Sequence, residues 1–113
     1  MAAPPEDQVA ELRLIHNDIS WAEEAGHTYI LLRSLNLPEG CTPKECEALL
    51  CPDGQHGYEA RLFFAVKVAT PAPRNWNLQV NLFGRNWFAF SWQLKATNLR
   101  LAQMLSMFLE ALR

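Results

Sequence analysis

The sequence lacks the features that mark membrane-bound, secreted or nucleic-acid-binding proteins. No apolar run approaches the ~20 residues needed to cross a bilayer, and the start of the chain has neither the basic nor the apolar region of a secretory signal. The formal net charge is only −2, so no long-range field attracts nucleic acid or an anionic membrane. We therefore expect a cytoplasmic protein that recognises other proteins by shape and local contacts.

Cysteine is also scarce, and its pattern does not suit a metal. There are three cysteines, an odd number that in a reducing compartment favours free thiols. Cys41, Cys46, Cys51 and His56 follow one another at intervals of five residues, whereas zinc sites are usually built from closer pairs. An odd separation on one strand would also point Cys46 and Cys51 to opposite faces. We predict neither a metal nor a cofactor.

Common catalytic and nucleotide-binding signatures are missing as well. The chain contains no phosphate-binding loop and no dinucleotide fingerprint. It also lacks the glycines of the G-x-S-x-G elbow, which excludes a serine hydrolase of that type.

What is present is a chain suited to one folded domain. Of its 113 residues, 50% are hydrophobic and only 19% are charged, which excludes a disordered chain. A chain of this length buries roughly two thirds of its unfolded surface without needing a disulfide or a metal. We therefore expect a single domain over residues 1–113.

The middle of the chain predicts an antiparallel meander of four to five strands. Apolar and alternating runs separated by turn residues are typical of such a sheet. Phe83–Asn86 is the predicted hairpin turn, with Gly84 able to take a positive φ. The predicted strand segments are Thr28–Leu37, Glu45–Cys51, Tyr58–Val68, Trp76–Leu82 and Phe88–Leu94, with Phe88 and Phe90 facing the core. Ile19–Ala22 is a weaker candidate for a further short strand.

Helices are predicted at both ends, which makes the fold class α+β. Pro4 and Pro5 precede two acidic residues, a pattern typical of a helix start. The final helix is predicted to be capped by Thr97 or Asn98. Its buried stripe is Leu101, Leu105, Phe108 and Leu112.

Four residues are candidates for nucleophilic or acid–base chemistry, and each also has a purely structural interpretation. Cys41 lies in a turn that could leave its sulfur accessible, while Cys51 ends a strand close in sequence to His56. His56 lies in a glycine-rich loop, where functional residues are common. Ser91 is a hydroxyl between large aromatic residues, with no base nearby in the sequence.

The predicted hairpin tip supplies candidates for partner binding. Arg85 and Asn86 carry hydrogen-bond donors that could meet a partner or an oxyanion, although turn formation alone would explain Asn86. Trp87 follows at the start of the aromatic segment. We expect these three residues to contact a partner protein.

The order of short motifs resembles the ubiquitin-conjugating-enzyme superfamily, in particular its prokaryotic family E branch. The resemblance covers about residues 19–113. It rests on residues 35–40 (Leu-Asn-Leu-Pro-Glu-Gly), 49–54 (Leu-Leu-Cys-Pro-Asp-Gly), Tyr58 leading to Phe63 and Phe64, and residues 83–87 (Phe-Gly-Arg-Asn-Trp) running to Ser91 and Trp92.

The resemblance implies a component of bacterial ubiquitin-like conjugation operons. Such a protein would take the C-terminus of a ubiquitin-like protein from its activating enzyme, as a thioester or an oxyester, and pass it on. The sequence departs from this pattern, because it has no His-Pro-Asn, no cysteine after Cys51, and no arginine and histidine between Ser91 and Trp92.

Two hypotheses therefore stay open. Either Ser91 or an upstream cysteine, Cys41 first, accepts the acyl group, or the chain is a catalytically inactive interaction module on the same fold.

Overall fold

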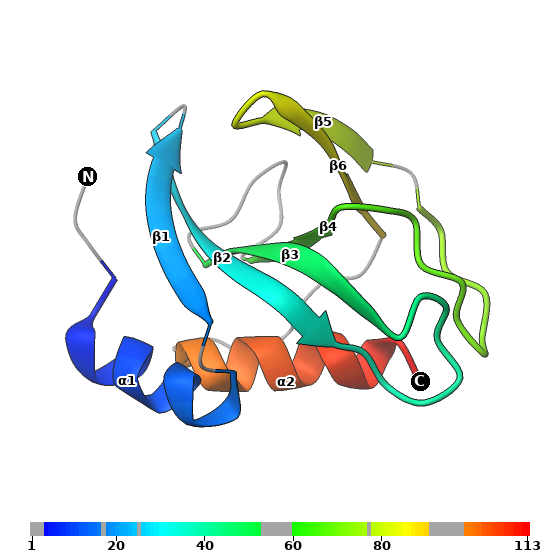
Figure 1. Cartoon of the computed structure of the whole chain (residues 1–113), viewed down its shortest axis with the longest axis horizontal. Coiled ribbons are helices and arrows are strands. Elements are labelled where there is room, and N and C mark those ends of the chain that lie inside the picture. The colour runs from blue at the N-terminus through cyan, green and yellow to red at the C-terminus, as the bar shows by residue number, and fades with distance from the viewer. Residues whose placement is uncertain (1–3, 17, 25, 53–59, 77, 91–98) are drawn as a thin grey trace.

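The computed structural model describes residues 4–16, 18–24, 26–52, 60–76, 78–90 and 99–113. A helix at each end encloses a run of strands (Figure 1), which confirms the α+β class. The elements are α1 (Glu6–Ile15), β1 (Ile19–Glu24), β2 (His27–Asn36), β3 (Glu45–Cys51), β4 (Arg61–Phe64), β5 (Leu78–Leu82), β6 (Arg85–Ala89) and α2 (Leu101–Ala111).

The described strands form one curled sheet of six strands in the order β1-β2-β3-β4-β6-β5. Every neighbouring pair is antiparallel, as predicted. The predicted number of four to five strands is wrong. Most side chains of β1 are exposed, so its sequence shows a weaker apolar alternation than the sequences of the other strands. In a simple meander β5 would lie beside β4, but in this sheet β6 lies beside β4 and β5 forms the outer edge.

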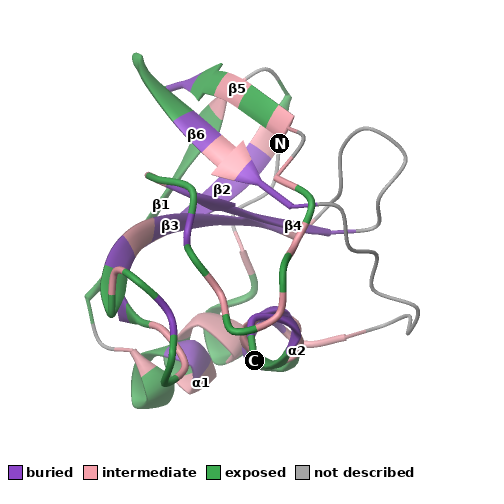
Figure 2. Ribbon diagram, turned by 90° about the vertical axis from the view of Figure 1, so that its right-hand side faces the viewer, coloured by how far each residue is buried: buried purple, intermediate pink, exposed green. Residues whose placement is uncertain are grey.

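The central strands are apolar on both faces, and each face has its own cover. Toward the helices, Leu50 and Leu62 pack in a core that α2 closes. On the opposite face, Leu49 and Phe63 pack with Trp87 of the β5–β6 hairpin. Figure 2 shows the sheet lying between the helices and the hairpin. Burying one large apolar side chain contributes about 1.5–3 kcal/mol, so both covers stabilise the fold.

The strand limits and faces near the hairpin differ from the prediction. The described part of the predicted strand Tyr58–Val68 narrows to Arg61–Phe64, and Val66 is 42% exposed. In β6, Trp87 and Ala89 are buried, whereas Phe88 is half-buried. Phe90, which follows β6, is buried in the core as predicted. The turn contains only Phe83 and Gly84, so β6 begins at Arg85. Arg85 and Asn86 therefore belong to the strand and not, as predicted, to the turn.

The helices meet through a polar clasp around Arg100. The buried stripe of α2 is as predicted, with Leu101, Leu105, Phe108 and Leu112 all buried. Its N-cap is Arg100, not Thr97 or Asn98, which lie outside the described residues. The Arg100 side chain binds Asp7 at 2.8 Å and Glu11 at 2.9 Å, both on α1. The N–H of Leu101 donates to Oε1 of Gln8 at 3.1 Å.

Two glycines at positive φ make a matched pair for testing the turns. Gly84 has φ +77° and open space where a Cβ would stand, whereas Gly40 has φ +93° and the Cγ of Pro71 only 2.7 Å from that position. Gly84→Ala should therefore lower the free energy of unfolding by about 1–2 kcal/mol through backbone conformation alone. Gly40→Ala should lower it further because of the added clash. Urea denaturation of both variants measures the difference, and equal losses would contradict the predicted clash.

The clasp also predicts a dependence on acid. Hydrogen bonding from Arg100 holds the pKa of Asp7 below its usual 3.8. The stabilisation by Asp7 is therefore present above pH 3.8 and is lost as the pH falls through the lowered pKa. Asp7→Asn should reduce the loss of stability seen in denaturation curves between pH 5 and pH 2. Asp18→Asn is the control, since Asp18 reaches Arg33 only at 3.8 Å. An equal effect of both changes would contradict a special role for the clasp.

Candidate functional site

The structure buries both cysteines that were candidate acyl acceptors. Cys41 is 4% exposed and Cys51 is fully buried. The Sγ of Cys41 lies 3.6 Å from the carbonyl oxygen of Leu112, at the end of α2. Cys51 ends β3 within the cluster beneath the hairpin. A ubiquitin-like C-terminus could reach neither sulfur without displacing the packing around it.

Burial also lowers the reactivity of the thiols. Desolvation raises the pKa of Cys41 and of Cys46, so less of the nucleophilic thiolate exists at neutral pH. All three cysteines are free thiols. No group of His, Cys, Asp and Glu among the described residues could hold a metal ion.

The other two chemical candidates, Ser91 and His56, lie outside the described residues. Acyl transfer to Ser91 stays a prediction from the motif order.

An apolar hollow lies on the sheet face opposite the helices, under the tip of the β5–β6 hairpin. We name it the hairpin groove. Its floor is formed by Tyr29 and Leu31 of β2 and Leu49 of β3. Leu31 lies opposite Leu49 in the β2–β3 register, which makes the floor a continuous apolar surface. Its volume is about 270 Å³, just below the ~300–1,000 Å³ of small-molecule sites.

Phe83 closes one end of the hairpin groove. Its ring meets the ring of Tyr29 edge-on, with 5.6 Å between centroids. Its backbone N–H donates to both carboxylate oxygens of Glu24 at the end of β1, at 3.0 and 3.2 Å. Phe83 has φ +52°, a left-handed conformation that costs a bulky residue about 1–2 kcal/mol. The turn at Phe83 was predicted from the sequence, but the position of the Phe83 ring at the end of a groove was not.

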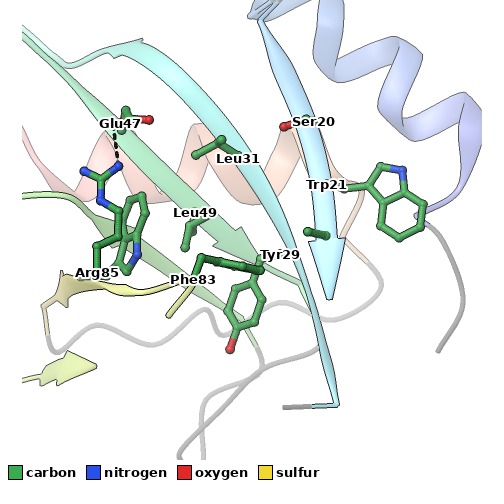
Figure 3. Close-up of a pocket in the computed structure, with 10 residues that line it drawn as sticks. Ser20, Trp21, Tyr29, Leu31, Glu47, Leu49, Phe83 and Arg85 are labelled. Carbon is green, nitrogen blue, oxygen red and sulfur yellow. Dashed lines mark hydrogen bonds and ion pairs between the residues drawn. The ribbon is translucent and has the colours of Figure 1, made fainter. Parts of the chain in front are cut away.

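Arg85 and Trp87, two of the predicted partner-binding residues, form the opposite wall. The Cζ of Arg85 lies 4.6 Å from the ring centroid of Trp87, and its Nη1 lies 2.8 Å from Oε1 of Glu47 on β3 (Figure 3). Trp87 is only 2% exposed, and its Nε1 donates to the carbonyl oxygen of Leu82 at 3.0 Å. Arg85 and Asn86 are exposed to solvent, whereas Trp87 lines the groove while being almost entirely buried.

The β1 side of the hairpin groove has no wall of large side chains. Ser20 and Ala22 face it, opposite Leu31 and Tyr29 in the β1–β2 register. Trp21 lies between them in the sequence, but its side chain points away to the other side of β1 (Figure 3). The groove is therefore open toward the edge of the sheet.

Comparison with known proteins assigns this chain to no family. The chain matches no protein-family model, no curated protein and no solved structure. No helix in the described part of the chain is long and apolar enough to cross a membrane.

The burial of the cysteines predicts slow thiol chemistry. In the native protein, all three should react with a thiol reagent such as 5,5′-dithiobis(2-nitrobenzoic acid) at least about tenfold more slowly than in the urea-unfolded chain. The reason is that each sulfur must first be exposed by local opening. Stopped-flow absorbance at neutral pH measures the rates. A native rate for Cys41 equal to that of the unfolded chain, with Cys46 and Cys51 replaced by alanine, would contradict this prediction.

Proposed function

We propose that this chain is an interaction module on a ubiquitin-conjugating-enzyme-like fold. It binds an exposed segment of a ubiquitin-like protein without carrying that protein on a cysteine. The fold and the partner class come from the motif resemblance. The choice of non-covalent binding comes from the chain itself, because Cys41 and Cys51 are buried.

The observation that carries the proposal is the hairpin groove. Hydrophobic pockets rimmed by a few polar groups mark binding sites, and aromatic side chains and arginine are the residues enriched at binding hot spots. The groove combines an aliphatic and aromatic floor with Arg85 at its rim. Three of its residues come from one short hairpin, so a rigid turn presents them together.

The proposal predicts that binding depends on Phe83. Phe83→Asn should weaken binding by at least about tenfold, since it removes an aromatic anchor worth roughly 2 kcal/mol. Asparagine suits the left-handed turn position, so the fold should be kept. Val66→Asn is the matched control, because Val66 is 42% exposed and Phe83 39%, while Val66 lies outside the groove.

The probes are ubiquitin and bacterial ubiquitin-like proteins, each with and without its C-terminal tail, together with a displayed library of random peptides. Isothermal titration calorimetry measures the affinities. Binding by no probe, or binding that Phe83→Asn leaves unchanged, would overturn the proposal. An adduct formed with an activating enzyme present, resistant to hydroxylamine and lost on Ser91→Ala, would instead show the covalent function.

A further inference from the structure

The strand at the edge of the hairpin groove has unpaired backbone groups facing outward. β1 is the outermost strand of the described sheet, and all six of its residues pair with β2 without a register shift. The N–H of Arg33 donates to the carbonyl of Asp18 at 3.2 Å. Since hydrogen-bonded pairs alternate in antiparallel sheets, Ser20 and Ala22 are also bonded to β2. Ile19 and Trp21 therefore direct their backbone N–H and C=O groups away from the sheet.

The first four residues of this edge lack the devices that normally prevent strand pairing. Natural proteins protect edge strands with proline, lysine, a bulge or an inward-pointing charge. The sequence of β1, Ile-Ser-Trp-Ala-Glu-Glu, has no proline and no lysine, and its first four residues carry no charge. Its even register excludes a bulge. The charges lie only at Glu23 and at Glu24, whose carboxylate accepts a hydrogen bond from the backbone N–H of Phe83. An unprotected edge of this length can accept another extended chain.

The side chains on β1 favour such an addition on its groove face. Ser20 and Ala22 are small, so large side chains of an added strand could lean across them toward Leu31 and Tyr29. On the other face, Trp21 is 44% exposed and would lie beside a neighbouring side chain of the new strand. Cross-strand aromatic pairs contribute roughly 0.2–1 kcal/mol each.

Charge indicates what kind of strand fits. β1 ends in Glu23 and Glu24 and contains no basic residue. A second copy of this chain, paired antiparallel about Trp21, would place Asp18 opposite Glu24 at both ends, and like charges directly opposed are destabilising. A strand with a basic residue near Glu23 and Glu24 has no such conflict.

We infer that a partner protein binds by adding an extended strand to the free edge of β1. Large apolar side chains at alternate positions of that strand enter the hairpin groove, and a basic side chain lies near Glu23 and Glu24. This inference rests on the proposed function and specifies how the bound segment is held. Backbone hydrogen bonds at Ile19 and Trp21 supply affinity, while the groove supplies selectivity.

The test separates the backbone of Trp21 from its side chain. Trp21→Pro removes the outward N–H without removing a bond to β2, and proline is tolerated at an edge strand. Trp21→Ala keeps that N–H and removes the indole. With a synthetic peptide selected from the display library, Trp21→Pro should weaken binding by at least about tenfold, and Trp21→Ala by no more than about threefold. Circular dichroism and thermal unfolding check that both variants fold.

Hydrogen exchange on the unmodified protein tests the same inference if Trp21→Pro fails to fold. Addition of the peptide should slow exchange of the Trp21 amide, followed by nuclear magnetic resonance, by at least about tenfold. The amide of Val66, a residue outside the hairpin groove, serves as the control and should not change. An unchanged Trp21 amide, together with peptide binding that Phe83→Asn abolishes, would overturn strand addition and leave the proposed function standing. Absence of any binding would overturn both. Concentration-dependent dimers that the peptide dissociates would assign the edge to a second copy.

Discussion

The fold depends on covering a sheet that is apolar on both faces. Along β3 and β4, Leu50 and Leu62 point toward the helices, while Leu49 and Phe63 point the other way. A sheet buried on one face only would leave the second set in water. The chain solves this by reversing at Phe83 and Gly84 and folding β5 and β6 back, which buries Trp87 over the second face. The hairpin is therefore required to cover the second face of the sheet.

The hairpin groove follows from the limited reach of this cover. The hairpin extends over β3 and part of β2, and its tip is tied to the rest of the sheet by contacts from Phe83 to Glu24 and Tyr29, and from Arg85 to Glu47. Between these contacts, small residues on β1 leave the floor uncovered. Exposed ion pairs contribute only about 0–1 kcal/mol. The aromatic contact and the buried Trp87 ring therefore do more than Arg85 to hold the tip in place.

Periodicity predicted most of the fold, because burial on one face imposes a spacing that can be read directly. The α2 stripe and the alternation of β5 are examples. It failed where burial did not set the pattern: β1 is largely exposed, and the cap of α2 is an arginine whose partners, Asp7 and Glu11, lie about ninety residues away. The candidate site was predicted less well. Arg85 was found from its turn, but the burial of Cys41 against α2, and the groove floor from Tyr29 to Leu49, depend on contacts between distant segments.

Phe83 links the fold to the proposed binding role. A two-residue turn with positive φ at both positions favours asparagine followed by glycine, yet here the first position is phenylalanine, with φ +52°. The left-handed backbone costs about 1–2 kcal/mol, and an edge-on aromatic pair such as Phe83 with Tyr29 returns about 0.5–1.5 kcal/mol. The two terms are of similar size, so the contact between the two rings offsets the strain of the turn. The Phe83 ring is 39% exposed beside the apolar groove, so the strained turn presents it on the surface to which the proposed partner would bind.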